Sequence, residues 1–333
     1  MKHIPVLLNE SIGLLDPKPG EFFIDGTIDG GGHATEIFKK ILPEGKLLGI
    51  DLDKNFLETT RLKISTELKI KNGELRNNLI LINGNYANLP KILKKNELPK
   101  ADGLLLDLGM SSEQLDSPVG ESGRGFSFLR DEPLIMRYAH KIQNSPKENK
   151  FSTGQAEFRI KNYLTAAEVI NSFSEKELGD IIWKFGEERF SRKIAKSIVE
   201  ERKKERILTV FQLVEAIKKS VPKGYQNRKI HPATKTFQAL RIYVNNELEN
   251  LENLLKNLEK ILKDNGRATI ISFHSLEDGL VKNYFRNMVK NKKARYLNKK
   301  PIVPAREEII LNPRSRSAKL RAIIIKYDNS SAK

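Results

Sequence analysis

Short apolar stretches alternate with amphipathic ones over the first 110 residues, and this alternation constrains the fold more than any other feature of the chain. The apolar stretches lie at 21–25, 46–51, 79–82 and 103–107. Apolar residues recur at helical spacing between them, and Asp53 is predicted to cap the second of these helices. Strands that are apolar on both faces and separated by helices are typical of a parallel sheet covered on both sides, so we predict an α/β fold.

This alternation stops near residue 111 and resumes near residue 232. The intervening stretch holds glycine- and serine-rich turns followed by helical patterns, without a convincing strand. Two more strands are expected later, at 268–273 and 320–327. We therefore predict a discontinuous domain of residues 1–112 and 232–333 with a mostly parallel sheet, interrupted by a mainly helical inserted domain of residues 113–231.

An apolar stripe precedes the first of these late strands. Six apolar residues from Val244 to Leu262 are separated by 4, 3, 4, 3 and 4 positions, which predicts one long helix ending at Asn265-Gly266. The stripe covers fewer than four heptads, so packing against the sheet is favoured over a coiled coil.

The glycine-rich stretch Asp25–His33 follows the first predicted strand. Its three successive glycines let the backbone turn sharply and approach a ligand closely. Asp51 ends the second strand, at roughly the 20-residue spacing at which an acidic residue meets ribose hydroxyls in nucleotide-binding units. Asp107 ends the fourth strand, and the carboxyl ends of parallel strands form the ligand edge of such sheets. These features predict a nucleoside site, although a loop-capping role for Asp107 is the alternative.

The charge of this loop indicates which nucleoside. Its glycines do not follow the GxGxxG pattern of pyrophosphate binders. Asp25 and Asp29 also place negative charge where a pyrophosphate would lie, which electrostatic repulsion disfavours. A cationic ligand with a ribose, such as a sulfonium nucleoside, fits better.

The chain is basic, with a formal net charge of +17. From residue 279 to the end there are 15 Lys and Arg residues against 3 Asp and Glu residues. Clustered basic side chains neutralise phosphates and release counterions, and Tyr284, Phe285 and Tyr296 could stack on bases. A nucleic acid partner is favoured, and a solvated basic tail is the alternative.

Several classes of site are excluded or disfavoured. The chain has no cysteine, which rules out disulfides, thiolate zinc sites and a cysteine nucleophile. Its five histidines are scattered without paired spacing, so no metal site is expected. No membrane span and no secretory signal is recognisable, so we expect a cytoplasmic protein without a membrane partner.

Several motifs in order along nearly the whole chain resemble the RsmH (MraW) family of bacterial methyltransferases. The motifs are His3–Leu8, Asp25–His33, Leu106–Ser112 with Gln114, Arg124–Phe128, Phe185–Phe190, His231–Ala239, Ser272–Asp278 and Asn312–Ser317. Members use S-adenosyl-L-methionine to methylate the N4 amine of a cytidine in 16S ribosomal RNA.

The resemblance implies a Rossmann-like methyltransferase fold and a set of site residues. S-adenosylmethionine would be contacted by Gly31, Gly32, His33, Asp51, Tyr86, Asp107 and Gln114. The inserted domain would recognise the substrate, either naked 16S ribosomal RNA or the small ribosomal subunit, and a homodimer is left open. The chain departs from the family at Asp29, where glycine is usual, and at Ile135, which replaces an acidic residue.

Methylation of an exocyclic amine is consistent with the missing cysteine, because methylating carbon 5 of a pyrimidine usually needs a thiolate. Asp107 is the candidate catalytic residue, since a carboxylate can accept hydrogen bonds from the amine. His274 is either a base near the substrate or a cap of the following helix. Arg314 and Arg316 suit phosphate contacts, with simple solvation as the rival interpretation.

Two other functions remain open at this point. A nicotinamide oxidoreductase could share the fold, and it would bind no S-adenosylmethionine. A ribosome-assembly factor without catalytic activity could keep the fold only to bind RNA.

Overall fold

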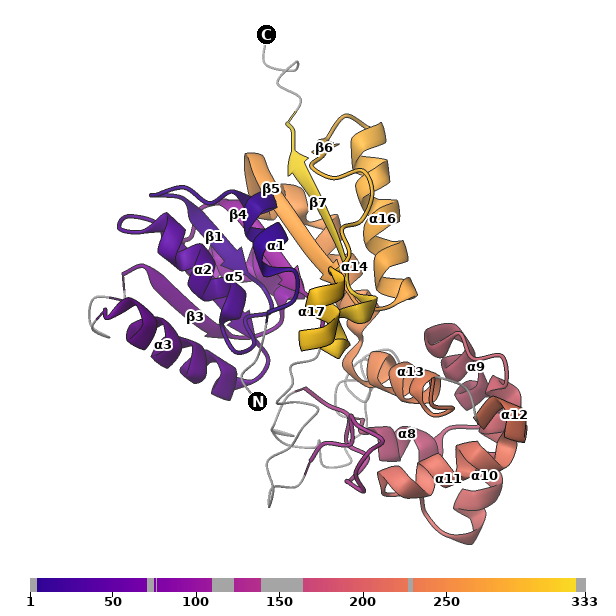
Figure 1. The fold of residues 1–333 in the computed structure, drawn as a ribbon. Helices are drawn as coiled ribbons and strands as arrows, with labels where there is room; N and C mark the ends of the chain where they lie inside the picture. Colours follow the sequence, from indigo (N-terminus) through magenta and orange to yellow (C-terminus); the bar gives the residue numbers. More distant parts are fainter. Residues whose placement is uncertain are drawn as a thin grey trace, which may run out of the picture. The chain divides into compact units, whose positions relative to one another are not determined.

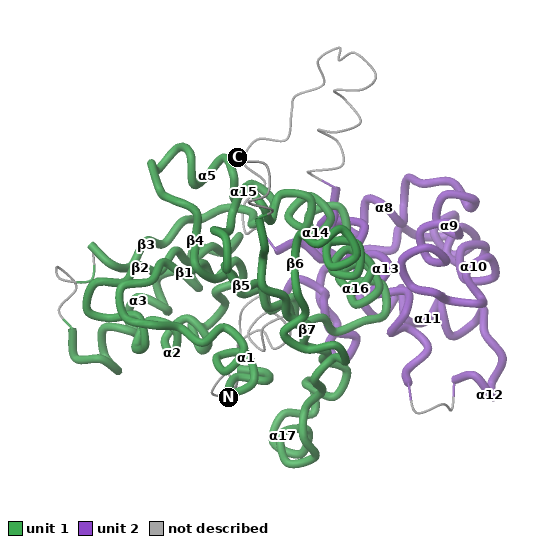
Figure 2. The backbone as a smooth tube through the Cα atoms, turned by 90° about the horizontal axis from the view of Figure 1, so that it is seen from above, with its two compact units in different colours: residues 1–111, 248–333 green, residues 112–247 purple. Residues whose placement is uncertain are grey.

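The computed structural model describes residues 5–70, 75, 77–109, 123–138, 164–226 and 230–327, and it divides the chain into two units (Figure 2). The first unit is formed by residues 1–111 and 248–333, and the second by residues 112–247. The end predicted for the inserted domain, residue 231, is therefore too early. Helix α13 (Thr234–Asn245) packs on helix α9 (Glu175–Gly186), and this packing makes it part of the second unit.

A seven-stranded sheet in the order β3-β2-β1-β4-β5-β7-β6 forms the centre of the first unit (Figure 1). Its strands are β1 (Phe22–Asp25), β2 (Lys46–Asp51), β3 (Leu79–Asn83), β4 (Ala101–Asp107), β5 (Leu262–Ser272), β6 (Ala294–Tyr296) and β7 (Lys319–Ile325). Strands β1 to β5 pair in parallel, whereas β7 runs antiparallel to β5 and to β6. The predicted mostly parallel α/β sheet is confirmed, and β6 is a short strand that the sequence did not predict.

Helices cover both faces of this sheet. Alternate strand residues point to opposite sides, so strands that are apolar throughout need cover on both faces. Phe23, Leu47 and Leu105 are buried on the face covered by α1 (Leu8–Leu15), α2 (Gly32–Ile41) and α3 (Lys54–Leu68). Phe22, Ile24 and Leu48 are buried on the other face. That face is covered by α5 (Leu89–Lys95), α14 (Glu247–Lys256), α15 (Leu258–Ile261) and α16 (Ser275–Lys290).

The single long helix predicted between Val244 and Leu262 is wrong. Helix α13 ends at Asn246, which has a left-handed backbone (φ 51°) and whose N–H is bonded to the carbonyls of Ile242 and Tyr243. Asn257 then separates α14 from α15, and Leu262 already belongs to β5. The leucines at 251, 255, 258 and 262 do pack against the sheet, as predicted.

The start of β5 also differs from the prediction. Asn265 and Gly266 do not end a helix but lie within β5, where the register shifts between Leu262 and Arg267. Asn265 has φ 61°, so this irregularity uses a residue type that tolerates the left-handed region.

The described part of the second unit is helical. Its remaining helices are α8 (Ala166–Ser172), α10 (Ser191–Lys204), α11 (Val210–Ser220) and α12 (Lys223–Gln226). Capping boxes start α8 at Thr165 and α9 at Ser174. Asn245 ties α13 to the segment before α8, because its amide donates to Met136 O (2.7 Å) and accepts from Tyr138 N (3.1 Å). Ile135 is half-buried in that segment.

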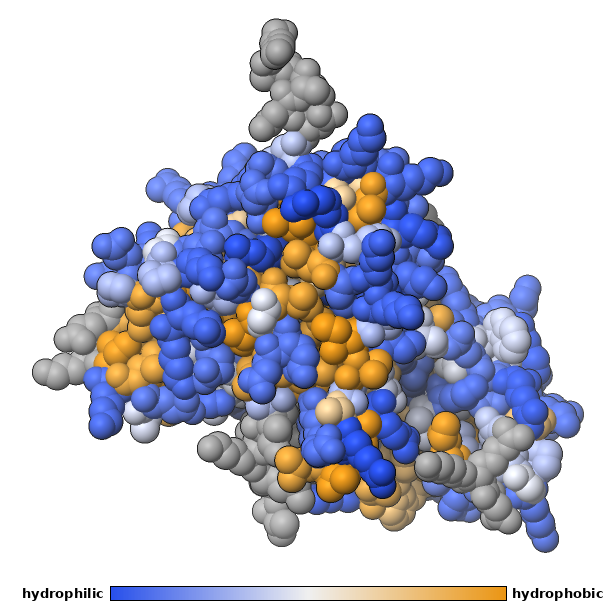
Figure 3. Space-filling view, turned by 45° about the horizontal axis from the view of Figure 1, so that its top comes forward, coloured by the Kyte–Doolittle hydropathy of each residue, from blue (hydrophilic) through white to orange (hydrophobic). Residues whose placement is uncertain are grey.

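The face shown in Figure 3 is mainly hydrophilic, with an apolar patch near its centre. Within the described residues, no helix has the length and apolarity needed to cross a bilayer.

Candidate functional site

The glycine-rich loop lies between β1 and α2, where two glycines are required by close packing. Gly31 has φ 71°, and a Cβ on it would lie 2.7 Å from Cγ2 of Thr60. A Cβ on Gly32 would lie 2.1 Å from Cγ of Pro5. Gly31 is also the N-cap of α2, so the loop brings bare backbone to a helix N-terminus.

Asp29 adopts φ 42° in the same loop, a conformation that aspartate tolerates better than most residues. Its carbonyl accepts the Thr60 hydroxyl at 3.1 Å, and its N–H donates to the Asp51 carboxylate at 3.1 Å. The non-glycine residue at this position is thus built into the loop by hydrogen bonds to two neighbouring elements.

Asp51 ends β2 and organises two loops at once. One carboxylate oxygen accepts the Asp29 N–H, and the other accepts the Asp53 N–H at 2.8 Å. Asp53 in turn caps α3 by accepting the Asn55 N–H, which confirms its predicted role. Burial raises the pKa of Asp51 to about 6, even though these backbone donors lower it. The Leu52 N–H also interacts with this carboxylate. Two carboxylate oxygens offer about four acceptor sites, so one site is left for a ligand hydroxyl.

Two further carboxylates are buried at neighbouring strand ends. The pKa of Asp25 is raised to about 7, mainly by burial. The hydrogen bond from the Thr27 N–H lowers this pKa, and the charges of Asp107 and Asp51 raise it. Burial likewise raises the pKa of Asp107 to about 7, with the charges of Glu277 and Glu308 adding to it. The sequence analysis did not identify these two glutamates, because they follow β5 and precede β7, far along the chain.

Thr27 links the glycine loop to β4. Its N–H donates to Asp25 at 3.1 Å, and its hydroxyl accepts the Asp107 N–H at 2.7 Å. The Asp107 carboxylate accepts the Gly109 N–H at 3.3 Å. The structure therefore brings Asp25, Asp51 and Asp107 to one edge of the sheet around the loop, as the strand order predicts.

His33 lies in the first turn of α2 and is buried. Its Nε2 is 3.0 Å from Val6 O, and because a carbonyl only accepts, Nε2 carries the proton. Nδ1 then faces Oδ2 of Asp107 at 3.9 Å. The segment that carries Val6 is held by the Leu7 N–H, which donates to Glu308 of α17 (Arg306–Leu311) at 2.8 Å.

Tyr86 begins a short 3₁₀ helix, η1 (Tyr86–Asn88), after β3. Its Cβ lies 3.3 Å from where a Cβ on Gly26 would be, so it stands beside the glycine loop. Asn83 at the end of β3 donates to Asp51 O at 3.0 Å. Gln114 lies outside the described residues. The roles assigned to Tyr86 and Gln114 stay predictions.

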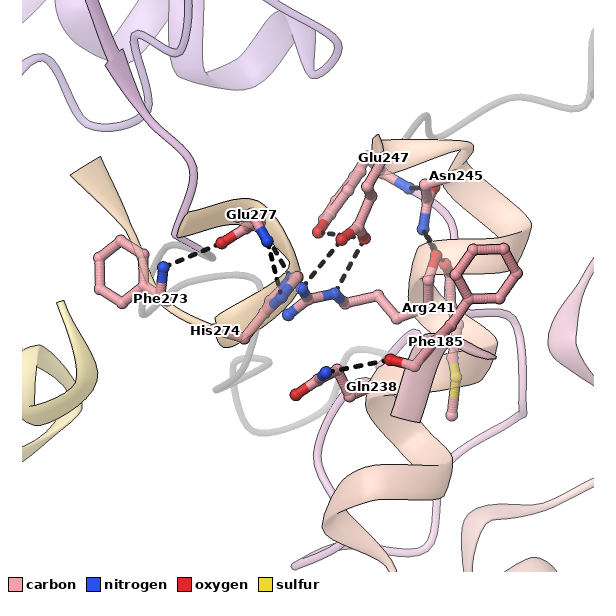
Figure 4. Close-up of polar contacts among 10 residues, drawn as sticks. Phe185, Gln238, Arg241, Asn245, Glu247, Phe273, His274 and Glu277 are labelled. Atoms are coloured by element: carbon pink, nitrogen blue, oxygen red, sulfur yellow. Dashed lines mark hydrogen bonds and ion pairs between the residues drawn. The ribbon is translucent and has the colours of Figure 1, made fainter. Parts of the chain in front are cut away.

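His274 is the N-cap of α16. Its Nδ1 accepts the Glu277 N–H at 3.4 Å, and its Nε2 lies 3.1 Å from the Glu277 carboxylate (Figure 4). The lone pair that a general base would use is engaged in capping, so the structure supports the capping interpretation. Arg314 and Arg316 are exposed on η2 (Pro313–Ser317), a position that leaves both of their interpretations open.

Comparison with known proteins gives one consistent result. The model of the MraW methylase family matches residues 1–153 and 156–326. The ribosomal RNA small subunit methyltransferase H of Syntrophus aciditrophicus is 41% identical over 334 residues, covering 96% of both chains. Proteins of the same name are 41% identical over 335 residues in Clostridium botulinum, strain Kyoto, and 43% identical over 321 residues in Thermosipho africanus. These two matches cover 96% of this chain and 97% and 96% of the respective relatives.

Proposed function

The chain belongs to the MraW methylase family, and from this membership we propose that it methylates the N4 exocyclic amine of a cytidine in small-subunit ribosomal RNA. The methyl donor is S-adenosyl-L-methionine. The observation that carries the site assignment is the set of three carboxylates around one glycine loop, of which Asp25 and Asp107 are buried and Asp51 is half-buried.

This arrangement fits a cationic nucleoside better than a dinucleotide. Buried carboxylates repel a pyrophosphate and attract a sulfonium, and the attraction is strong because water is excluded. Gly31 and Gly32 are required because Thr60 and Pro5 fill the space of their side chains, and this packing holds the loop at the N-terminus of α2. The same negative charge argues against a nicotinamide dinucleotide in this loop.

We assign roles to the residues from their positions. Asp51 accepts hydrogen bonds from the ribose hydroxyls, Gly31 and Gly32 border the ligand with their backbone, and Tyr86 lies on the adenine side. His33 lies beside the Asp107 carboxylate, with Nδ1 3.9 Å from Oδ2. Bound S-adenosylmethionine supplies a methyl group on a positively charged sulfur.

Asp107 is the group proposed to hold the amine. The exocyclic nitrogen gains a bond to the methyl carbon and must release one proton. An ionised carboxylate can accept a hydrogen bond from this N–H as positive charge grows on the nitrogen, which lowers the barrier. The raised pKa of Asp107, about 7, allows it to take up a proton near neutral pH and pass it to solvent. Alignment of the amine with the methyl–sulfur bond supplies the rest of the rate.

A methyl-transfer assay tests this proposal. Purified protein with labelled S-adenosylmethionine should label 16S ribosomal RNA, presented either naked or in small subunits from a strain lacking the enzyme. Asp51→Ala should lower the rate roughly 10- to 100-fold, because a charge-assisted hydrogen bond contributes about 1.5–3 kcal/mol. Gly31→Trp should abolish binding of the donor, measured by calorimetry, whereas Gly13→Trp changes an exposed glycine with open space around it and should not.

The outcomes separate the three candidate functions. If neither naked 16S ribosomal RNA nor the small subunit is labelled, the proposal is contradicted. Retained RNA binding would then favour an assembly factor. Binding of a nicotinamide dinucleotide in place of S-adenosylmethionine would favour an oxidoreductase. Mass spectrometry of the labelled nucleotide decides between N4 and any other atom of the base.

A further inference from the structure

The turn between α9 and α10 of the second unit, which the proposed chemistry does not use, lies next to the start of α13. The turn Glu187–Phe190 joins α9 to α10, and α13 packs against it. Lys235 Nζ donates to Glu187 O at 2.8 Å. Gln238 of α13 donates to Phe185 O at 3.1 Å (Figure 4). The N-terminal turn of α13 thus places Lys235 beside the end of α9.

Aromatic rings hold a second cation at this turn. The guanidinium carbon of Arg189 lies 4.7 Å from the ring centroid of Phe190 and 5.2 Å from that of Tyr225. The two rings pack edge to face with centroids 4.9 Å apart. Lys193 Nζ lies 5.8 Å from the Phe190 ring. We call the cations Arg189, Lys193 and Lys235 around residues 187–190 the basic turn.

The nearest buried acid does not neutralise these cations. Glu188 is fully buried, and its carboxylate accepts the Tyr225 hydroxyl at 2.5 Å and the Phe190 N–H at 2.9 Å. Among the residues that the structure describes, no carboxylate forms an ion pair with Arg189 or Lys193. Both side chains are exposed. Glu188 therefore orders the turn. The exposed Glu187 carboxylate also lies in it, so the cations Arg189, Lys193 and Lys235 outnumber the two carboxylates by one charge.

An exposed aromatic residue bears on the choice of ligand. Trp183, the only tryptophan of the chain, lies in the last turn of α9 with 58% of its surface exposed. Its carbonyl accepts the Glu187 N–H at 3.0 Å, so Trp183 lies one helical turn before Glu187, the first residue of the turn Glu187–Phe190.

We infer that the basic turn binds the phosphate backbone of the RNA substrate, with Trp183 as a stacking surface for an unpaired base. Unpaired exposed cations beside aromatic rings suit a phosphate chain that carries bases. An acidic protein would be served by the cations but would have no use for an exposed indole. This inference deepens the proposed function and rests on it.

Binding of 16S ribosomal RNA and of small subunits from a strain lacking the enzyme tests the inference. The variant is Arg189→Ala with Lys193→Ala, and the matched control is Lys196→Ala with Lys203→Ala, which removes the same charge from exposed positions of α10. Losing two phosphate contacts should lower the slope of log K against log salt by about 1.5 in the variant. Affinity at moderate salt should fall roughly tenfold, and the control should keep a slope near that of the wild type.

Additional measurements keep the result interpretable. Arg189→Lys with Lys193 intact retains the charge and should recover most of the salt slope, whereas Trp183→Ala should weaken binding with an unchanged slope. The Michaelis constant for RNA should rise in the double variant with little change in kcat, and calorimetry should give an unchanged affinity for S-adenosylmethionine.

Equal RNA affinities and salt slopes for the variant and its control, with an active wild-type enzyme, would overturn the inference while leaving the proposed function intact. The same holds if the double variant binds RNA normally but no longer binds an acidic ribosomal protein. A wild-type protein without methyl transfer would instead refute the proposed function.

Discussion

Asp25→Asn tests whether the charge buried beneath the glycine loop costs stability. The Asp25 side chain is 1% exposed, and its carboxylate oxygen accepts the Thr27 N–H. Asparagine keeps that acceptor and removes the charge. The substitution therefore changes the electrostatics of this position with little change in shape.

The expected magnitude follows from the pKa. The unfolded chain loses this proton near pH 3.8, whereas the folded chain holds it until about pH 7. The contribution of Asp25 to the free energy of unfolding is therefore fully present below pH 3.8 and is lost as the pH rises from 3.8 to about 7. Above pH 7 it no longer changes with pH. Each pH unit in that window corresponds to about 1.4 kcal/mol, so between pH 5 and pH 8 Asp25 lowers the free energy of unfolding by roughly 3 kcal/mol. The Asn variant lacks this loss.

Urea unfolding of both proteins at pH 5 and pH 8 measures the effect. Circular dichroism follows both units, while fluorescence of Trp183 follows the second unit alone, because it is the only tryptophan. We expect the variant to gain roughly 3 kcal/mol in free energy of unfolding relative to wild type on going from pH 5 to pH 8. The tryptophan transition should not change between the two proteins.

Asp264→Asn is the matched control, since it makes the same chemical change at an exposed residue of the first unit. The comparison separates the effect of the buried charge from that of the substitution itself. If Asp25→Asn shows the same difference at pH 5 and pH 8, within about 0.5 kcal/mol, the reasoning on this buried carboxylate is wrong.

Three further predictions concern the loop, the cofactor and the second unit. Gly32→Ala should lower the free energy of unfolding by about 1–3 kcal/mol, because its Cβ would overlap Pro5. Gly13 lies in open space, so Gly13→Ala should raise the free energy of unfolding by about 0.5–1 kcal/mol. Urea unfolding that ranks the two variants in the opposite order would refute the packing argument. Affinity for S-adenosylmethionine should rise about tenfold between pH 5.5 and pH 8 as the buried carboxylates ionise, and a flat calorimetric profile would contradict the cation assignment. Tyr225→Phe leaves the buried Glu188 without its hydroxyl donor, so the tryptophan-detected transition should lose about 1–3 kcal/mol, and an unchanged transition would show that this hydrogen bond is not stabilising.

The sequence alone determined the sheet and the edge at which the site lies. Continuous apolar strands require burial on both faces, and acidic residues at the ends of parallel strands must then meet at one edge. Asp51 and Asp107 were predicted on this basis, and the structure places both there. The capping role of Asp53 was also predictable, because an N-cap depends only on local sequence.

The tertiary structure decided what depends on contacts between distant segments. The apolar stripe at 244–262 has helical period, yet Asn246 turns left-handed and divides it, because α13 packs on α9 while α14 packs on the sheet. Periodicity predicts which residues of a segment are buried, but it does not predict which element they pack against. The pKa of Asp107 is raised first by its burial and further by the charges of Glu277 and Glu308. The basic turn depends on the hydrogen bond from Lys235 to the Glu187 carbonyl. These pairs are separated by 48 to 201 positions, so only the folded chain brings the two groups of each pair together.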